Sequence, residues 1–288
     1  AKVENGALLL NVGEERSKLR TVATSEINEA YQLTDLGGGK VLVQAFGETE
    51  YYNGVSSVNA NFGIGNDSLI LTQGFGLSVT AKGGDGNDIL ASAGSASVDF
   101  EGQGGNDILF GGSGADSLKG GDGNDYIEGG AGGDTITGGS GNDRIFGIIS
   151  DLLGDTIDAG TGNDKLEVKG TAKSDILQFA GQGSSLKISS GTPTSASAWG
   201  LESLLIVPAD GADTVILEDS VRNVVGSIEI NLLEGGSQRD DKVILIQSDS
   251  ADLVDVTASN VLAPSTVQRL TDSPAPISTT KVDTTSAT

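Results

Sequence analysis

The chain contains no cysteine, no histidine and no methionine. Without cysteine it has no disulfides, no thiol catalysis and no thiolate metal sites. Without histidine it has no Ser-His-Asp triad and no histidine-ligated zinc. Because methionine is missing, we expect a chain that was processed or cut from a longer precursor. We find no signal peptide and no apolar run long enough to span a bilayer.

Basic residues are scarce as well, since 17 Lys and Arg stand against 40 Asp and Glu and the net charge is −23. Such a chain repels phosphate backbones, which excludes nucleic acid as a partner. Either the acidic residues form a solvated, self-repelling surface, or bound cations neutralise them. The positions of the acidic residues decide between these two explanations.

Glycine is abundant, at 44 residues, and in the middle of the chain it recurs with a period of nine. Five units with the pattern Gly-Gly-x-Gly-x-Asp-x-Leu-x follow one another over residues 102–146, and looser copies begin at Phe62, Gly83 and Ala159. The glycine-rich half of a unit predicts a turn. The other half predicts a three-residue strand with one side chain pointing inward. The inward positions are held by Leu109, Ile127, Ile136 and Ile145.

A strand this short buries a core only when coils stack, so the repeat predicts a solenoid. If one coil contains two units, units 18 residues apart lie on the same face, and the Asp residues at the sixth position form two columns. The first Asp column consists of Asp67, Asp88, Asp107, Asp125, Asp143 and Asp164. The second Asp column consists of Asp116, Asp134, Asp155 and Asp175, and it is preceded by Ser97 where the pattern requires Asp.

Stacked carboxylates predict metal binding. Neighbouring coils of a parallel stack lie roughly 4.8 Å apart, so their carboxylates repel unless a cation lies between them. Ca–O distances of roughly 2.4 Å allow one ion to touch both carboxylates, and main-chain carbonyls can complete a shell of about six oxygens. Such hard ligands favour Ca²⁺ over zinc or copper. We expect about five to eight ions; a solvated acidic surface would not explain Asp and Gly in fixed phase.

The units resemble the haemolysin-type calcium-binding repeats of RTX proteins, most closely over residues 62–167. The resemblance implies a right-handed parallel β-roll with calcium between turns stacked on the same side, in a bacterial protein secreted by the type I route. It implies that both Asp columns are ligands. Residues at the first and third positions of the units are further candidates: Gly83, Asp85, Gly102, Gly104, Gly111, Ser113, Gly120, Asp122, Gly129, Ala131, Gly138 and Ser140.

We therefore predict an all-β chain with four parts. Residues 1–61 are N-terminal β coils or a cap, 62–178 are the calcium-binding β-roll, 179–263 are a degenerate, calcium-poor β-solenoid, and 264–288 are a Ser/Thr/Pro-rich linker or tail. In the third part, the unit that begins at Pro208 keeps the glycine, the Asp and an inward Val215.

Three functions compete. The first is an extracellular structural module of a surface layer, filament or adhesin that folds on calcium after export, with self-association, other surface proteins or polysaccharide as partners. The second is the accessory domain of a secreted enzyme or toxin whose catalytic domain lies outside this chain, because neither His-Glu-x-x-His nor Gly-x-Ser-x-Gly is present. The third is ice binding, which the varied third positions of the units disfavour. We expect no enzymatic activity.

Overall fold

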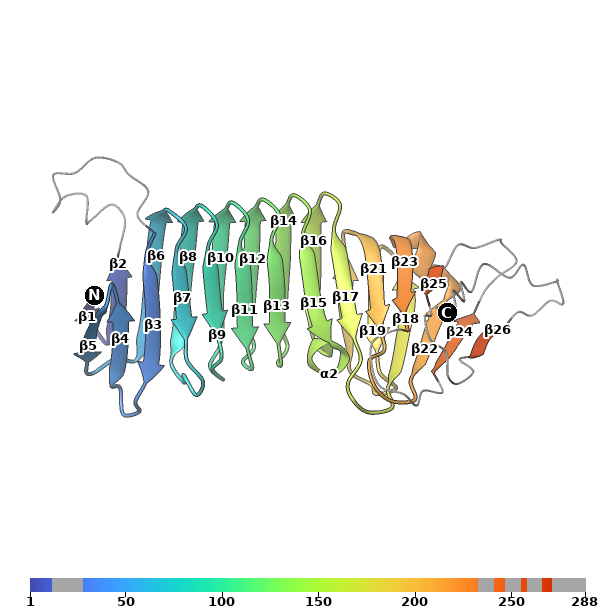
Figure 1. Ribbon diagram of the computed structural model, residues 1–288, viewed down its shortest axis with the longest axis horizontal. Helices are drawn as coiled ribbons and strands as arrows, with labels where there is room; N and C mark the ends of the chain where they lie inside the picture. Colours follow the sequence, from blue (N-terminus) through green and yellow to red (C-terminus); the bar gives the residue numbers. More distant parts are fainter. Residues whose placement is uncertain (12–27, 233–240, 247–254, 258–265, 271–288) are drawn as a thin grey trace, which may run out of the picture. The chain divides into compact units, whose positions relative to one another are not determined.

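The computed structural model describes residues 1–11, 28–232, 241–246, 255–257 and 266–270. The chain divides into two compact units, residues 1–144 with 160–162 and residues 145–159 with 163–288. Strands dominate both units (Figure 1). This confirms the all-β prediction.

The repeats of the first unit form coils of two strands, one in each of two parallel sheets. The first sheet contains β6 (Ser57–Ile64), β8 (Ser78–Asp85), β10 (Val98–Gly104), β12 (Ser117–Asp122) and β14 (Thr135–Ser140), in this order. The second sheet contains β7 (Ser68–Leu71), β9 (Ile89–Ser92), β11 (Ile108–Gly112) and β13 (Tyr126–Gly130). Leu109 pairs with Ile127 and Leu118 with Ile136. The predicted stacking of units 18 residues apart is therefore correct.

The core of the first unit lies between these two sheets. Side chains alternate along each strand, so that every second residue is buried, as in the pattern of β12 and β13. Leu109, Leu118 and Ile127 are completely buried. Each strand contributes only one to three buried apolar residues, so the apolar core exists only because successive coils place them in rows.

The N-terminal part of the chain both extends the stack and caps it. β2 (Ala7–Asn11) runs parallel to β6, and β3 (Ala30–Asp35) runs parallel to β7. β1 (Lys2–Glu4) pairs antiparallel with β2, while β4 (Val41–Ala45) and β5 (Glu48–Tyr52) continue from β3 as an antiparallel meander. The outermost strands are short or carry acidic side chains, which discourages further strand pairing at this end.

The second unit is less regular. β15 (Arg144–Ile148), β17 (Lys165–Lys169), β21 (Leu201–Val207), β23 (Val225–Asn231) and β25 (Asp255–Thr257) lie in one sheet. The other contains β16 (Thr156–Thr161), β20 (Ser195–Trp199), β19 (Ser185–Ser189), β18 (Ile176–Gln182), β22 (Thr214–Glu218), β24 (Lys242–Ile246) and β26 (Thr266–Leu270), in this spatial order. The described helices are the short α2 (Ile149–Leu152) and the 3₁₀ helix η1 (Asp219–Asn223), and neither has the length that a membrane crossing requires.

Two features of the second unit differ from the sequence prediction. β18, β19 and β20 form an antiparallel meander, so the solenoid expected after residue 178 is interrupted before parallel pairing resumes at β22 and β24. β26 lies inside the segment expected to be a linker or tail, and it pairs parallel with β24. β26 pairs with the edge of β24, whose sequence is the apolar KVILI (242–246). The Ser/Thr/Pro-rich composition of the segment did not reveal this strand. The remainder of 264–288 lies outside the described residues.

Truncation of an inward residue should destabilise the stack in proportion to the cavity it leaves. We expect Leu118→Ala to lower the free energy of unfolding of the calcium-loaded chain by about 2–5 kcal/mol, because Leu118 is completely buried. Lys119→Ala is the matched control, since Lys119 is exposed on the same strand. Urea denaturation followed by circular dichroism measures both. Equal stabilities for the two variants would contradict the stacked core.

Candidate metal centre

The Asp residues of the first Asp column lie in the turns that lead from the first sheet to the second. Their carboxylates are buried between successive coils, with exposed fractions of 2% for Asp67, 1% for Asp88, 1% for Asp107 and 2% for Asp125. Isolated carboxylates are rarely buried, because removal of the charge from water is costly. Their burial therefore requires interactions that compensate it.

One oxygen of each carboxylate joins neighbouring coils. The backbone N–H of each Asp donates to Oδ1 of the Asp in the next coil. The distances are 2.7 Å for Asp67 to Asp88, 2.7 Å for Asp88 to Asp107, 2.8 Å for Asp107 to Asp125 and 2.9 Å for Asp125 to Asp143. The second Asp column repeats the arrangement, since the N–H of Asp116 donates to Oδ1 of Asp134 at 2.9 Å.

The other carboxylate oxygen has no hydrogen-bond donor. Oδ2 is buried and without a partner in Asp67, Asp88, Asp107, Asp116 and Asp125. An ionised oxygen left in this state destabilises the fold unless a cation compensates it. The same unpaired oxygen recurs in successive coils, so it is a regular feature of the repeat.

In the units that begin with glycine, this first residue leaves a space into which these oxygens point. A Cβ on Gly102 would overlap Oδ2 of Asp107, and it would lie 2.7 Å from the carbonyl oxygen of Gly120 in the next coil. A Cβ on Gly120 would likewise overlap Oδ2 of Asp125 and lie 2.6 Å from the carbonyl oxygen of Gly138. A carboxylate oxygen and a main-chain carbonyl thus converge in each turn. This all-oxygen arrangement fits Ca²⁺.

Main-chain atoms must supply most of the coordination shell. No group of three or more acidic side chains gathers at one point in the part of the chain that the structure describes. The carbonyls of Asp85, Gly104, Asp122 and Ser140, at the third position, each accept one N–H from the preceding coil. A carbonyl oxygen has a second lone pair, so these residues remain candidate ligands. The geometry agrees with the predicted donor set, and the assignment of individual ligands stays a prediction.

A second ladder accompanies the carboxylates. The N–H of each Asn at the fifth position donates to Oδ1 of the Asn in the preceding coil, which is opposite in direction to the Asp ladder. The pairs are Asn66 with Asn28, Asn87 with Asn66, Asn106 with Asn87, Asn124 with Asn106, and Asn142 with Asn124, at 2.7–2.8 Å. In each of these turns, the N–H of Asn is bonded by the preceding coil and the N–H of the following Asp is bonded by the next coil. Two successive N–H groups of the turn are therefore satisfied, one by each neighbouring coil.

The first Asp column begins one coil earlier than predicted. The N–H of Glu29 donates to Oδ1 of Asp67 at 2.6 Å, and Oδ1 of Asn28 accepts a hydrogen bond from the N–H of Asn66. Asn28 and Glu29 therefore occupy the fifth and sixth positions of an additional coil, with Tyr31 in the inward position. The segment Asn-Glu-Ala-Tyr-Gln carried this signal, but its Glu and the absence of glycine before it concealed the match.

The start of the second Asp column needs a correction. The register pairs Asp99 with Ser117 and Phe100 with Leu118. Val98 therefore lies at the sixth position, and its N–H donates to Oδ1 of Asp116 at 2.8 Å. Ser97, which was expected there, is exposed one residue earlier. An insertion in the preceding loop displaced the alignment by one residue.

The end of the second Asp column is also different. β20 and β19 lie between β16, which follows Asp155, and β18, which follows Asp175, so these two Asp residues do not stack. Oδ2 of Asp175 instead accepts bonds from N and Oγ1 of Thr171, at 2.6 and 2.8 Å. The expected calcium site between Asp155 and Asp175 is therefore wrong.

Two acidic residues of the second unit, Glu202 and Asp241, were missed, and Asp213 was recognised only as the Asp of the unit that begins at Pro208. The N–H of Asp164 donates to Oε2 of Glu202 at 2.7 Å, which places Glu202 in the coil after Asp164. The N–H of Asp175 donates to Oδ1 of Asp213 at 2.8 Å, and the N–H of Asp213 to Oδ1 of Asp241 at 3.0 Å. These residues are separated by 38, 38 and 28 positions. Long and variable loops concealed them from a search for a nine-residue period.

Burial shifts the acidity of the Asp columns. It raises the pKa of Asp88 to about 6 and that of Asp107 to about 7, although the N–H bond to each carboxylate opposes the shift. Burial also raises the pKa of Asp67, Asp116 and Asp125. Without metal, these carboxylates are therefore less acidic in the folded chain than in water.

Comparison with known proteins identifies the repeat. The model of the RTX calcium-binding nonapeptide repeat (4 copies) matches residues 101–136, 120–147 and 153–167. A search of curated proteins found no match to the chain. Residues 101–167 therefore contain RTX repeats, which bind calcium. The turns of Asp67 and Asp88 lie outside the matched residues and share the same hydrogen-bond geometry.

Substitution of the first glycine should block the space between the oxygens. We expect Gly102→Ala to raise the calcium concentration at the folding midpoint about tenfold or more, because one lost charged or polar contact costs about 1–3 kcal/mol. Gly104→Ala is the control in the same turn, since its Cβ would meet nothing closer than 3.5 Å. Calcium titration followed by circular dichroism compares them. A midpoint for Gly102→Ala equal to that of Gly104→Ala would exclude the proposed geometry.

The raised pKa values predict an unusual pH dependence for the calcium-free chain. Folded carboxylates with pKa values of about 6 and 7 bind protons more tightly than unfolded ones, so their contribution is full below the unfolded value of 3.8 and is lost as the pH rises through 6 to 7. The calcium-free chain should therefore show more β-sheet circular dichroism at pH 5 than at pH 8. Asp107→Asn should reduce this difference. A stronger β-sheet spectrum at pH 8 would contradict the burial of uncompensated carboxylates.

Proposed function

We propose that this chain is a calcium-dependent structural module of a secreted bacterial surface protein, such as a surface layer, a filament or an adhesin, and that it folds on calcium after export. The observation that carries the proposal is the buried, donorless Oδ2 that recurs in successive coils from Asp67 to Asp125. A fold that requires a cation at every turn is suited to an environment rich in calcium.

Calcium binding and folding are coupled in such a chain. The two ligands that converge at Gly102 come from different coils, Asp107 from one and Gly120 from the next, so the site exists only when the coils are stacked. Binding free energy then becomes folding free energy. At the low calcium concentration of a bacterial cytoplasm, the charge of −23 opposes compaction and favours an exportable, unfolded chain. Calcium outside the cell reverses this balance.

The coil pairs suggest the number of ions. Within the first unit, the first Asp column has four successive Asp pairs from Asp67 to Asp143, and the second has the pair Asp116 and Asp134. One ion for each pair gives about five in this unit. The upper value of about eight included the pair Asp155 and Asp175, which the strand order removes.

A structural role agrees with the arrangement of the acidic residues. In the coils between Asp67 and Asp143, each Asp uses one oxygen to join coils and offers the other in the same buried turn. These carboxylates and the metal therefore hold neighbouring coils together. We expect no enzymatic activity. The alternative is the accessory domain of a type I-secreted enzyme or toxin. The sequence of the whole precursor separates the two, because a catalytic domain beyond this chain would favour the alternative.

The proposal predicts that calcium controls folding. The chain freed of calcium at pH 8 should lack the β-sheet circular dichroism spectrum, and millimolar calcium should restore it with a reduced radius in small-angle X-ray scattering. Magnesium at the same concentration should be less effective, because it requires a smaller and more rigid octahedral shell.

Asp107→Asn tests the role of a single column residue, with Asp99→Asn on the exposed face of β10 as its control. The first variant should need more calcium to fold and the second should not. A wild-type chain that is fully folded in excess chelator at pH 8 would refute the proposed function.

A further inference from the structure

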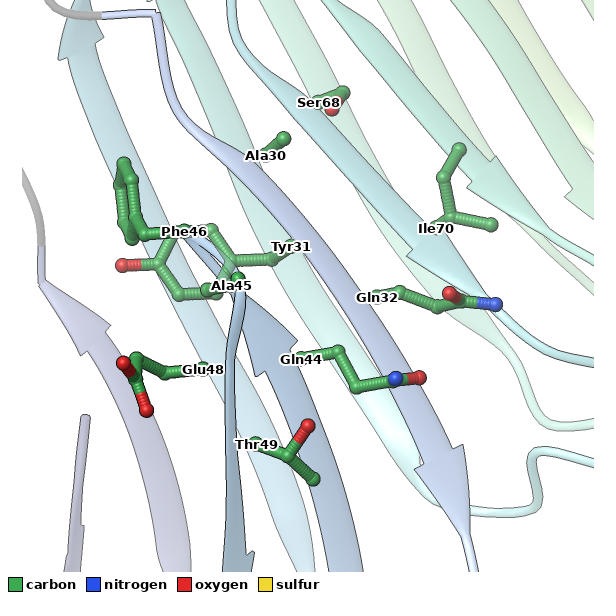
Figure 2. A pocket seen from close by; sticks show the side chains of 11 residues that line it. Ala30, Tyr31, Gln32, Gln44, Ala45, Phe46, Glu48, Thr49, Ser68 and Ile70 are labelled. Atoms are coloured by element: carbon green, nitrogen blue, oxygen red, sulfur yellow. The ribbon is translucent and has the colours of Figure 1, made fainter.

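The described part of the first unit has a hollow on its outer surface, and two of its lining residues, Ala30 and Ser68, directly follow Glu29 and Asp67 of the first Asp column. It has a volume of about 340 Å³ and lies over β3, β4, β5 and β7 (Figure 2). Gln32, Gln44, Thr49 and Ile70 form its floor, in a single row across the four strands, because Gln32 pairs with both Ile70 and Gln44, and Gln44 pairs with Thr49. The calcium-binding role uses none of these side chains.

An aromatic ring stands at the rim of the hollow. Phe46 is 53% exposed, whereas Phe62, Phe75, Phe100 and Phe179 are fully buried. Its ring contacts the edge of Tyr31 at a centroid distance of 5.9 Å and an interplanar angle of 89°. Tyr31 packs in turn on Phe62, at 5.8 Å. The exposed ring is therefore supported from the core.

The backbone presents this ring at a conformational cost. Ala45 and Glu48 are the last pair of β4 and β5, so Phe46 and Gly47 form a two-residue hairpin loop. Both have positive φ, +55° for Phe46 and +78° for Gly47, as in a type I′ turn. Asn is preferred at the first of these positions, and a bulky aromatic residue is disfavoured. An exposed aromatic residue at a strained position suggests contact with a ligand.

The polar groups of the hollow restrict the chemistry of that ligand. Gln32 and Gln44 each both donate and accept hydrogen bonds, and Thr49 and Ser68 add hydroxyl groups. Among the described residues that line the hollow, none is Lys or Arg and Glu48 supplies a negative charge, so anionic ligands are disfavoured. Hydroxyl groups of a ligand match these amides, and an apolar C–H face matches the ring of Phe46.

A neutral sugar carries both features, since its hydroxyls lie around a ring whose faces are apolar. We propose that this hollow binds a neutral polysaccharide, with one sugar ring packed against Phe46 and its hydroxyls bonded to Gln32 and Gln44. The row ends at Thr49 because β5 is the last strand of the sheet, and on the other side it continues from Ile70 to Ala91 of β9, so a polymer can extend beyond the hollow in that direction. The inference rests on the proposed function in that polysaccharide is one of the partners expected of such a module, and it adds the site and the chemistry of that contact.

Affinity electrophoresis of the full chain in millimolar calcium tests the inference. Native gels would contain dextran, laminarin or galactomannan as neutral probes, and dextran sulfate as a charged counterpart of dextran. We expect at least one neutral polysaccharide to retard the wild-type chain and dextran sulfate to retard it less. No retardation by any of the three neutral probes, or equal retardation by dextran sulfate, would overturn the proposal.

Variants of the rim and the floor distinguish binding from folding. Phe46→Asn should weaken binding at least tenfold while it preserves the fold, because Asn suits the turn better than Phe. Phe46→Trp should retain binding, and the double variant Gln32→Ala with Gln44→Ala should weaken it at least tenfold. Leu36→Asn is the control, since Leu36 is 48% exposed in the loop at the other end of β3.

Wild-type binding by Phe46→Asn would overturn the proposal, as would an equal loss of binding in Leu36→Asn. Circular dichroism with and without calcium is recorded for each variant. A chain that folds on calcium but binds no neutral polysaccharide refutes the sugar site and leaves the proposed function intact. A chain that is folded without calcium but binds the sugar refutes only the proposed function.

Discussion

Buried carboxylates between stacked turns are the constraint on which the first unit depends. In Asp67, Asp88, Asp107 and Asp125, Oδ1 accepts a hydrogen bond from the backbone of the preceding coil and Oδ2 has no donor. In the units that begin with Gly83, Gly102, Gly111, Gly120 and Gly129, a side chain at the first position would occupy the space that Oδ2 requires. The Asn before the Asp bonds the opposite neighbouring coil. Glycine, asparagine and aspartate therefore recur at fixed positions because each has its own role in the same negatively charged turn.

This constraint does not apply evenly along the chain. The first column is continuous from Glu29 to Asp143, but the second begins only at Asp116, because Val98 occupies the preceding sixth position. In the second unit, Oδ2 of Asp175 accepts hydrogen bonds from Thr171 in its own loop, and the antiparallel meander separates Asp175 from Asp155. There the parallel strands β21 and β23 pair over a mainly apolar register, with Leu204 beside Ile228. The second unit therefore keeps apolar pairing between its parallel strands, but its series of hydrogen-bonded carboxylates are shorter than the first Asp column.

The cation-dependent turns and the outer hollow are connected through the first coils. Glu29 bonds to Asp67 immediately before β3 and β7 begin, and these two strands carry Gln32 and Ile70 on their outer side. Order in the turn of Asp67 therefore also orders part of the floor of the hollow. A module that becomes rigid on calcium and contacts polysaccharide through a fixed surface would suit the exterior of a bacterial cell.

The sequence by itself determined the repeat, the all-β fold, the inward residues Leu109 and Ile127 and the pairing of units 18 residues apart, because glycine turns and a nine-residue period permit few other arrangements. It also indicated the oxygen-rich turns that RTX repeats use for calcium. The stacking of the Asp residues from Asp67 to Asp143 also follows from the sequence, whereas only the tertiary structure decided where the Asp columns begin and where the second one ends. Loop insertions shifted Val98 into the place expected for Ser97, and the meander removed Asp175 from the column of Asp155. Tertiary structure alone also gathered Phe46, Gln32 and Ile70 around one hollow, since strand pairing brings together residues that no local pattern connects.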